Sequence, residues 1–324
     1  MHLMEIVFKL AFFFVPDANV PRAIRKKRKA NAPKPLPLGR KRALSISSDI
    51  DKVSFVEIQL EEQKGSTRKQ YMCSQQQSNF LTLLPLEIRR KIWSFCVGNM
   101  DLHLVREAKK LVAIQCLGEE EESRWPPCAH LCWGQPSRAF PGYHGICPGY
   151  LLDTNGCPLF PDPIPLLQTC RMIYSEAIPM LYHENTFRFN HIDTILSLSQ
   201  TILPSRLNLI RTVHLAYAFP VLMYGEDKSE NAVPPYDAAT WEETCRILAN
   251  MAGLRELYMH LGGSLLYHEI HEVLGPLHHI QQTDVFELFV GIRQDPTKVY
   301  QMDNKPFKFV SLNVDTGRGW FCCR

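Results

Sequence analysis

The chain has 324 residues, of which 45% are hydrophobic, and a formal net charge of +3. This composition allows a sizeable buried core in one large domain or two small ones, and it excludes a chain that is disordered throughout. Eleven cysteines in a chain of this length, and no N-x-[ST] glycosylation acceptor, argue against a small disulfide-rich scaffold. They favour an intracellular protein, located in the nucleus or the cytoplasm.

An apolar run, LMEIVFKLAFFFV, occupies residues 3–15. It is shorter than the roughly 20 apolar residues that a membrane-spanning helix needs. Glu5 and Lys9 interrupt it, and no small-residue cleavage site follows it. We therefore expect no secretion and no membrane partner.

Residues 1–79 are predicted to form this apolar N-terminus followed by a disordered basic and Pro-rich tail. Residues 22–42 contain ten Lys or Arg and no acid, so the rest of the chain is acidic overall. Two basic clusters in this tail resemble a bipartite nuclear-import signal. They consist of Arg25, Lys26, Lys27, Arg28 and Lys29, and of Arg40, Lys41 and Arg42. The tail also suggests an alternative role as a nuclear, nucleic-acid-associated factor, although the acidic remainder makes nucleic acid an unfavoured partner.

The segment FLTLLPLEIRRKIWSFCVG, residues 80–98, predicts an amphipathic helix. Pro85 suits the first turn, and Gly98 is expected to end the helix in the left-handed conformation. The apolar residues at helical spacing are Leu81, Leu84, Ile88, Ile92 and Phe95. The face they form is expected either to pack in the core or to contact a partner.

Two short strands, DLHLV and KLVAIQCL, follow as a predicted hairpin. Residues 118–165 form an irregular insertion rich in Cys, His, Pro and Gly. Beyond it helical and strand patterns alternate, beginning with a helix that Pro179 is expected to break or kink. Strand alternation is clearest at Val213, Leu215 and Tyr217, and a later helix turns Trp241 and other apolar residues inward and stops at Gly253.

Strands joined by helical crossovers favour a mainly parallel sheet. We therefore predict an α/β fold in which one domain, residues 80–310, contains the N-terminal helix and hairpin followed by alternating helices and strands. Residues 311–324 are expected to be a frayed C-terminus.

The Cys/His insertion offers thiolate and imidazole groups of the kind that bind zinc. The candidate ligands are Cys128, Cys132, Cys147 and Cys157. Their spacing matches no standard zinc signature, and free cysteines are often simply buried, so a zinc-binding metalloprotein or enzyme is the alternative and not the main prediction.

Other chemistry is not indicated. His268 and His271 are three residues apart, whereas the metalloprotease helix needs His at i and i+4. The sequence contains no G-x-G-x-x-G, no G-x-x-x-x-G-K-[ST] and no G-x-S-x-G motif. We therefore expect no enzymatic activity, no cofactor and no small-molecule substrate.

Several segments resemble a family of filamentous-fungal proteins catalogued as domain of unknown function 7730 and often described as F-box-like. These segments are FLTLLPLEIRRKIWSFCVG, CAHLCWGQP, PLLQTCRMIYSEAIPMLYHENTFRFNHIDTIL, LPSRLNLIRTVHL and MAGLRELYMHL. The resemblance covers most of residues 80–295.

The opening LPLEIRRKIW is similar to the start of an F-box, whose helices bind an adaptor of cullin-type ubiquitin ligases while the C-terminal region holds a substrate. By this resemblance the positions that bind the adaptor are Leu84, Pro85, Ile88, Ile92 and Trp93. The expected function is thus a non-enzymatic protein–protein interaction module, F-box-like, with a ubiquitin-ligase adaptor as its partner. The predicted hairpin stands where an F-box would continue with further helices.

Overall fold

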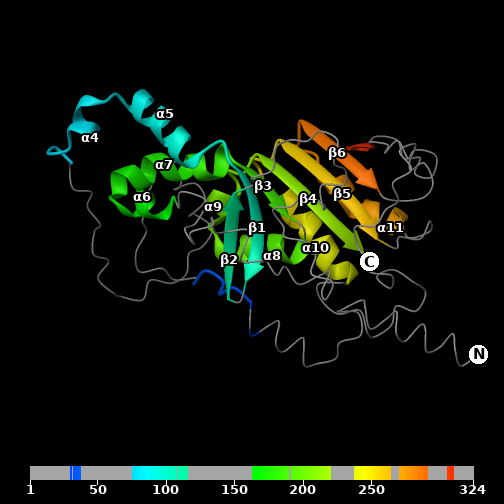
Figure 1. Cartoon of the computed structure of the whole chain (residues 1–324). Coiled ribbons are helices and arrows are strands. Elements are labelled where there is room, and N and C mark those ends of the chain that lie inside the picture. The colour runs from blue at the N-terminus through cyan, green and yellow to red at the C-terminus, as the bar shows by residue number, and fades with distance from the viewer. Residues whose placement is uncertain are drawn as a thin grey trace, which may run out of the picture. The chain divides into compact units, whose positions relative to one another are not determined.

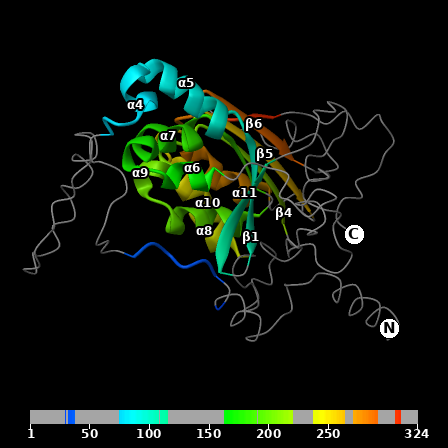
Figure 2. The same cartoon turned by 60° about the vertical axis from the view of Figure 1, so that its left-hand side comes forward.

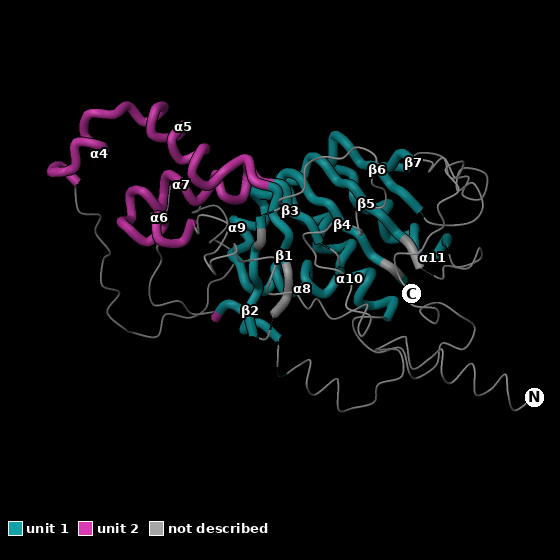
Figure 3. The backbone as a smooth tube through the Cα atoms, viewed as in Figure 1, with its two compact units in different colours: residues 1–36, 101–160, 186–324 teal, residues 37–100, 161–185 magenta. Residues whose placement is uncertain are grey.

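The computed structural model describes residues 30, 32–37, 75–107, 109–115, 163–189, 191–219, 237–263, 270–290 and 305–309. It divides the chain into two compact units (Figures 1 and 3). Unit 1 comprises Met1–Leu36, Asp101–Phe160 and Thr186–Arg324, and unit 2 comprises Pro37–Met100 and Pro161–Asn185. Each unit is therefore built from segments that are distant in the sequence.

The described strands of unit 1 form one seven-stranded sheet with the order β2-β1-β3-β4-β5-β6-β7. Only the β1–β2 hairpin is antiparallel, and every other neighbouring pair is parallel. The strands are β1 (Asp101–Glu107), β2 (Lys110–Gln115), β3 (Thr186–Phe189), β4 (Thr212–Phe219), β5 (Glu256–Gly263), β6 (Val285–Val290) and β7 (Lys308–Phe309). The predicted α/β fold with a mainly parallel sheet is confirmed.

Apolar side chains line one face of this sheet. Phe189, Leu215, Met259 and Leu288 are register partners across four strands, and all are buried. The rings of Tyr217 and Phe219 lie against Trp241. This face is covered by α8 (Ile192–Thr201), α10 (Ala238–Ala249), α11 (Ile270–Leu274) and the 3-10 helix η5 (Gly275–His279). The strand alternation and the inward side of the Trp241 helix were thus predicted correctly.

The strand order explains why the helices share a face. From β3 to β7 the parallel strands are neighbours in the same order as in the sequence. Parallel crossovers are almost always right-handed, so a sheet that grows in one direction carries its crossover helices on one side. Figures 1 and 2 show α8 and α10 on the same side of the strands.

Unit 2 is helical in its described part. Its helices are α4 (Asn79–Leu83), α5 (Leu86–Val97), α6 (Ile164–Gln168) and α7 (Arg171–His183). Their buried core consists of Trp93, Val97, Leu167, Ala177 and Ile178. The ring of Phe80 packs against that of Trp93 with centroids 5.2 Å apart and planes tilted by 53°. The chain leaves this unit after α5 and returns to it with α6.

The predicted inward face of α5 is wrong in part. Trp93 and Val97 are the buried residues of this helix, whereas Ile88 and Phe95 are exposed. The buried seam follows the i, i+4 spacing from Arg89 through Trp93 to Val97. Arg89 faces inward because a partner in α7 neutralises it, and apolar periodicity alone does not reveal such a partner.

The end of α5 also differs from the prediction. Gly98 has φ −104° and ψ 178°, which is extended backbone, and Asn99 adopts the left-handed conformation with φ 55°. Asparagine tolerates this conformation. Glycine is required at position 98 for another reason, because a Cβ there would collide with Oε2 of Glu184 and lie 2.8 Å from the carbonyl oxygen of Ser94.

Pro179 lies inside α7 and does not end it, because the helix continues to His183. The break falls earlier, between α6 and α7, where the Sγ atom of Cys170 accepts the backbone N–H of Ile173 at 3.5 Å and caps α7. The expected break at Pro179 is therefore wrong.

Among the residues that the structure describes, no helix is long and apolar enough to cross a membrane.

Part of the predicted disordered tail is described by the structure. Pro33 is buried, and the backbone N–H of Leu36 donates to the carbonyl oxygen of Gln200 in α8 at 2.8 Å. Proline-rich chain is extended and loses little entropy when it is fixed, which suits it to docking on a helix end. Residues 32–36 thus have a defined place in unit 1.

Gly253 allows a close backbone approach. The helix before it ends at Ala249, with Asn250 as its C-cap, so Gly253 is not the helix stop that its position in the sequence suggests. A Cβ at Gly253 would collide with the carbonyl oxygen of Asn208 and lie 3.3 Å from that of Ile210. Both obstacles are backbone atoms and cannot rotate away.

We predict that Gly253→Ala lowers the free energy of unfolding by about 1–3 kcal/mol, the usual cost of overpacking. Gly275→Ala is the matched control, since a Cβ there meets nothing within 4 Å, and its effect should lie within about 1 kcal/mol of zero. Urea denaturation followed by circular dichroism measures both. Equal midpoints for the two variants would contradict the assigned role of Gly253.

Candidate functional site

The exposed large apolar side chains among the described residues all lie in unit 2. They are Leu83 at 73%, Ile88 at 42%, Phe95 at 86% and Ile164 at 50% of full exposure. Ile88 and Phe95 are seven residues apart and therefore share one side of α5. We name Leu83, Ile88 and Phe95 the α4–α5 apolar surface. Isolated exposed apolar residues are ordinary, but a group of them on one helical unit indicates a contact surface.

Charged residues flank this surface. Glu87, Arg90 and Lys91 are exposed on the same helix. An apolar centre with a polar rim is the usual anatomy of a protein–protein interface. The arrangement keeps the surface compatible with water while leaving Phe95 available for burial by a partner.

The residues predicted to bind an adaptor have different environments. Pro85 and Ile88 are exposed, and Leu84 and Ile92 are half-buried. Trp93 is 3% exposed and belongs to the core of unit 2, so it cannot contact a partner in this structure. Leu83 and Phe95 are the most exposed large apolar residues of the described chain, although the F-box resemblance does not single them out.

A buried polar network holds α5 against α7. The Nε and Nη2 atoms of Arg89 donate to the two carboxylate oxygens of Glu176 at 3.0 and 2.7 Å. The Nε1 atom of Trp93 donates to Oε2 of the same carboxylate at 3.0 Å. Such a bidentate pair fixes geometry as well as charge.

Arg89 also secures the end of α4. Its Nη1 atom donates to the carbonyl oxygens of Leu81 and Leu84 at 3.1 and 2.6 Å. These carbonyls lie where α4 ends, and carbonyls at a helix end have no partner within the helix. One guanidinium group therefore determines how the Leu83 segment enters α5, and with it the position of the α4–α5 apolar surface.

The environment of Glu176 stabilises its charged form. Burial by itself raises the pKa of this carboxyl group, but hydrogen bonds from Arg89 and Trp93 and the positive charge of Arg89 outweigh it, so that the pKa of Glu176 is lowered. A carboxyl group whose pKa is lower in the folded state stabilises the fold above its unfolded pKa, and it loses this contribution as the pH falls through the folded value.

Asn185 makes a second connection between the two segments of unit 2. Its Nδ2 atom donates to the carbonyl oxygens of Val97 and Leu181 at 2.7 and 2.8 Å, and its Oδ1 atom accepts the N–H of Met100 at 2.7 Å. The amide satisfies backbone groups at the ends of both α5 and α7. This residue therefore fixes the point at which the chain leaves the helical unit.

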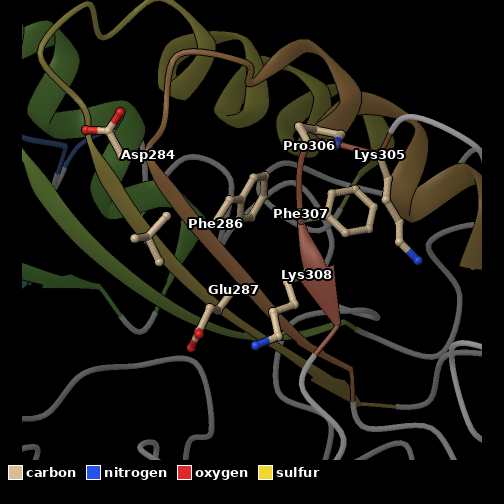
Figure 4. Close-up of a pocket in the computed structure, with 8 residues that line it drawn as sticks. Asp284, Phe286, Glu287, Lys305, Pro306, Phe307 and Lys308 are labelled. Carbon is tan, nitrogen blue, oxygen red and sulfur yellow. The ribbon is translucent and has the colours of Figure 1, made fainter.

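A shallow hollow of about 350 Å³ lies beside the last two strands of unit 1 (Figure 4). The rings of Phe286 and Phe307 meet within it edge to face, with centroids 5.5 Å apart. The side chains of Asp284 and Lys305 point apart in Figure 4. These two charged groups do not converge as those of an acid–base site would.

Other predicted sites lie outside the residues that the structure describes. These are the candidate zinc ligands Cys128, Cys132, Cys147 and Cys157, and the import clusters at residues 25–29 and 40–42. Within the described residues, no group of three or more His, Cys, Asp or Glu could hold a metal ion. The zinc and import hypotheses therefore stay predictions from the sequence.

We predict that Glu176→Ala lowers the free energy of unfolding by about 3–5 kcal/mol, because it leaves the Arg89 guanidinium buried without its counter-charge. Wild-type stability should fall as the pH drops below about 4.5, the ordinary pKa of a glutamate, because the pKa of Glu176 is lowered in the folded state and its stabilising charge is lost as the pH falls through that lowered value. Glu176→Gln keeps the shape of the side chain and should show a weaker decline. Thermal melts at several pH values measure both, and parallel curves for wild type and Glu176→Gln would contradict the role of this charge.

The family model described as Domain of unknown function (DUF7730) matches residues 73–309, which include the described elements from α4 to β7. No curated protein and no solved structure matches the chain. The match covers more than half of the chain and both of its units. The chain belongs to the DUF7730 family of domains of unknown function.

Proposed function

We propose that this protein is a non-enzymatic interaction module that binds a protein partner through the α4–α5 apolar surface. The observation that carries the proposal is the exposure of Leu83, Ile88 and Phe95 on helices that the Arg89–Glu176 pair holds in place. Burying a large apolar side chain contributes about 1.5–3 kcal/mol. Three such residues contribute at most about 4.5–9 kcal/mol when a partner buries them fully, and a preorganised surface lowers the entropy cost of association that this gain must offset.

The partner we propose is an adaptor of cullin-type ubiquitin ligases, in keeping with the F-box-like segment LPLEIRRKIW. An F-box continues with further helices after its first, whereas here a β-hairpin follows α5 in the sequence. Helices α6 and α7 support the proposal, because they pack with α5 in one core after the chain has returned from the hairpin.

The contact residues differ from those that the F-box resemblance implied. Trp93 serves as the internal anchor, with its ring against Phe80 and its N–H on Glu176. Contact with the adaptor is assigned instead to Leu83, Pro85, Ile88 and Phe95. We propose as well that this module is of fungal origin and is located in the nucleus.

We predict that the full chain co-elutes with a purified ubiquitin-ligase adaptor in size-exclusion chromatography, and that Phe95→Asp weakens the complex at least about tenfold. A charge placed in an apolar interface must be desolvated without a counter-charge, which costs more than the lost contact alone. Ile88→Asp should act in the same direction. Isothermal titration calorimetry provides the dissociation constants.

Gln281→Glu is the control, because it introduces the same charge at an exposed position of unit 1. Circular dichroism melts show whether each variant is folded; Phe95 is exposed, so its replacement should leave stability nearly unchanged. A folded Phe95→Asp variant that binds the adaptor like the wild type would contradict the proposed surface. Absence of any adaptor binding by the wild type would contradict the proposed partner.

A further inference from the structure

The sheet of unit 1 has a second face that carries no described helix. Parallel sheets are normally covered on both faces and then have apolar residues on both. Here one continuous row of register partners is polar across six strands. The row consists of His103, Arg188, His214, Tyr258, Glu287 and Lys308, and we name it the polar row.

The length of the polar row suits a macromolecular ligand. His103 is fully buried, so the accessible part of the row runs from Arg188 to Lys308. Four interstrand spacings of about 4.8 Å give it a length of about 19 Å, which an extended peptide of about six residues would span. From His214 to Glu287 the side chains are half-buried, so they can contact a ligand without being mobile surface groups.

The β3–β4 part of the row is already neutralised. The Nε atom of Arg188 donates to both carboxylate oxygens of Asp101 at 2.6 and 2.7 Å, and its Nη1 atom lies 3.4 Å from Nδ1 of His214. Burial, with the charge of Arg188 adding to it, lowers the pKa of His214 to about 3. His214 is therefore uncharged at neutral pH, and this part attracts neither sign strongly.

The β5–β6 part keeps negative charge. Glu256 lies two residues before Tyr258 on the same side of β5, and Glu287 is the register partner of Tyr258 on β6. Within the described part of the chain, neither glutamate has a basic nitrogen within 4.0 Å. Lys308 is the register partner of Glu287 but is exposed and forms no such pair.

Tyr258 places an aromatic face beside these carboxylates. His214 stacks on one face of its ring, with centroids 4.5 Å apart and planes 26° apart. Glu287 is the register partner of Tyr258 on the other neighbouring strand. Burial and the charges of Glu256 and Glu287 raise the pKa of Tyr258, as expected in a negative field. A cation above an aromatic ring and between carboxylates gains from both.

We propose that the face of the sheet that carries no described helix binds an extended basic segment of a partner protein, with a Lys or Arg side chain over Tyr258 between Glu256 and Glu287. The charges of Glu256 and Glu287 favour a basic residue of the partner at this position. The rest of the polar row contacts the residues that neighbour it in the partner's segment. This surface is distinct from the α4–α5 apolar surface and does not depend on adaptor binding.

Two fluorescein-labelled decapeptides test the proposal on the full chain by fluorescence anisotropy, one with Lys and one with Glu at alternate positions among Gly and Ser. The Lys peptide should bind, and Glu256→Gln with Glu287→Gln should weaken its binding by about three- to tenfold. Tyr258→Leu should also weaken it, whereas Tyr258→Phe should retain binding because the ring remains. Carbodiimide coupling of the Lys peptide should map to Glu256 or Glu287 by mass spectrometry.

Glu242→Gln with Glu272→Gln is the matched control. It removes two exposed carboxylates from α10 and α11, on the helix-covered side, and changes the net charge by the same amount. Equal weakening by the control pair would show a non-specific charge effect and overturn the proposal. Tighter binding of the Glu peptide would assign the face to an anion at Arg188 and overturn it as well, as would a Lys peptide that does not bind.

Discussion

The pairing of Arg89 with Glu176 is the interaction on which the helical unit depends. A guanidinium at 12% exposure is costly to bury alone, and here it meets a carboxylate at 13% exposure at 2.7 Å. The same carboxylate accepts the indole N–H of Trp93, and the same guanidinium closes the end of α4. Two helices from distant segments and a third element are thereby fixed around one ion pair. With Arg89, Trp93 and Val97 turned inward, the opposite side of α5 is left to Ile88 and Phe95.

The two units place their apolar and polar side chains in opposite ways. The helical unit buries its core between helices and exposes large apolar side chains on the outside. The sheet unit buries an apolar face under helices and leaves a polar row on the other face. The second arrangement follows from strand order, because a sheet that adds strands in one direction receives its crossovers on one side. An exposed apolar group and a polar row therefore occur in a single chain.

Much of the sheet could be predicted from the sequence, whereas the helical unit could be predicted only in part. Strand alternation at Leu215 and Tyr217 identifies the buried face because strands have a period of two and only one face is apolar. In α5 either the side that carries Ile88 or the side that carries Trp93 could face the core. The choice rests on Glu176, which lies 87 residues from Arg89 in the sequence. Gly98 and Gly253 stand where the backbone approaches other groups closely. In the sequence alone, each looks like a glycine that ends a helix.

The division of unit 2 into two segments affects how the chain tolerates change. The two segments are joined by Asn185, whose side-chain amide donates hydrogen bonds to the backbone of Val97 in one segment and of Leu181 in the other. The entropy needed to close a loop grows only with the logarithm of its length, about 0.6 kcal/mol for each doubling. Residues can therefore be added or lost between β2 and α6 at small thermodynamic cost to the helical unit. The stability of the helical unit therefore depends little on the number of residues that separate its two segments in the sequence.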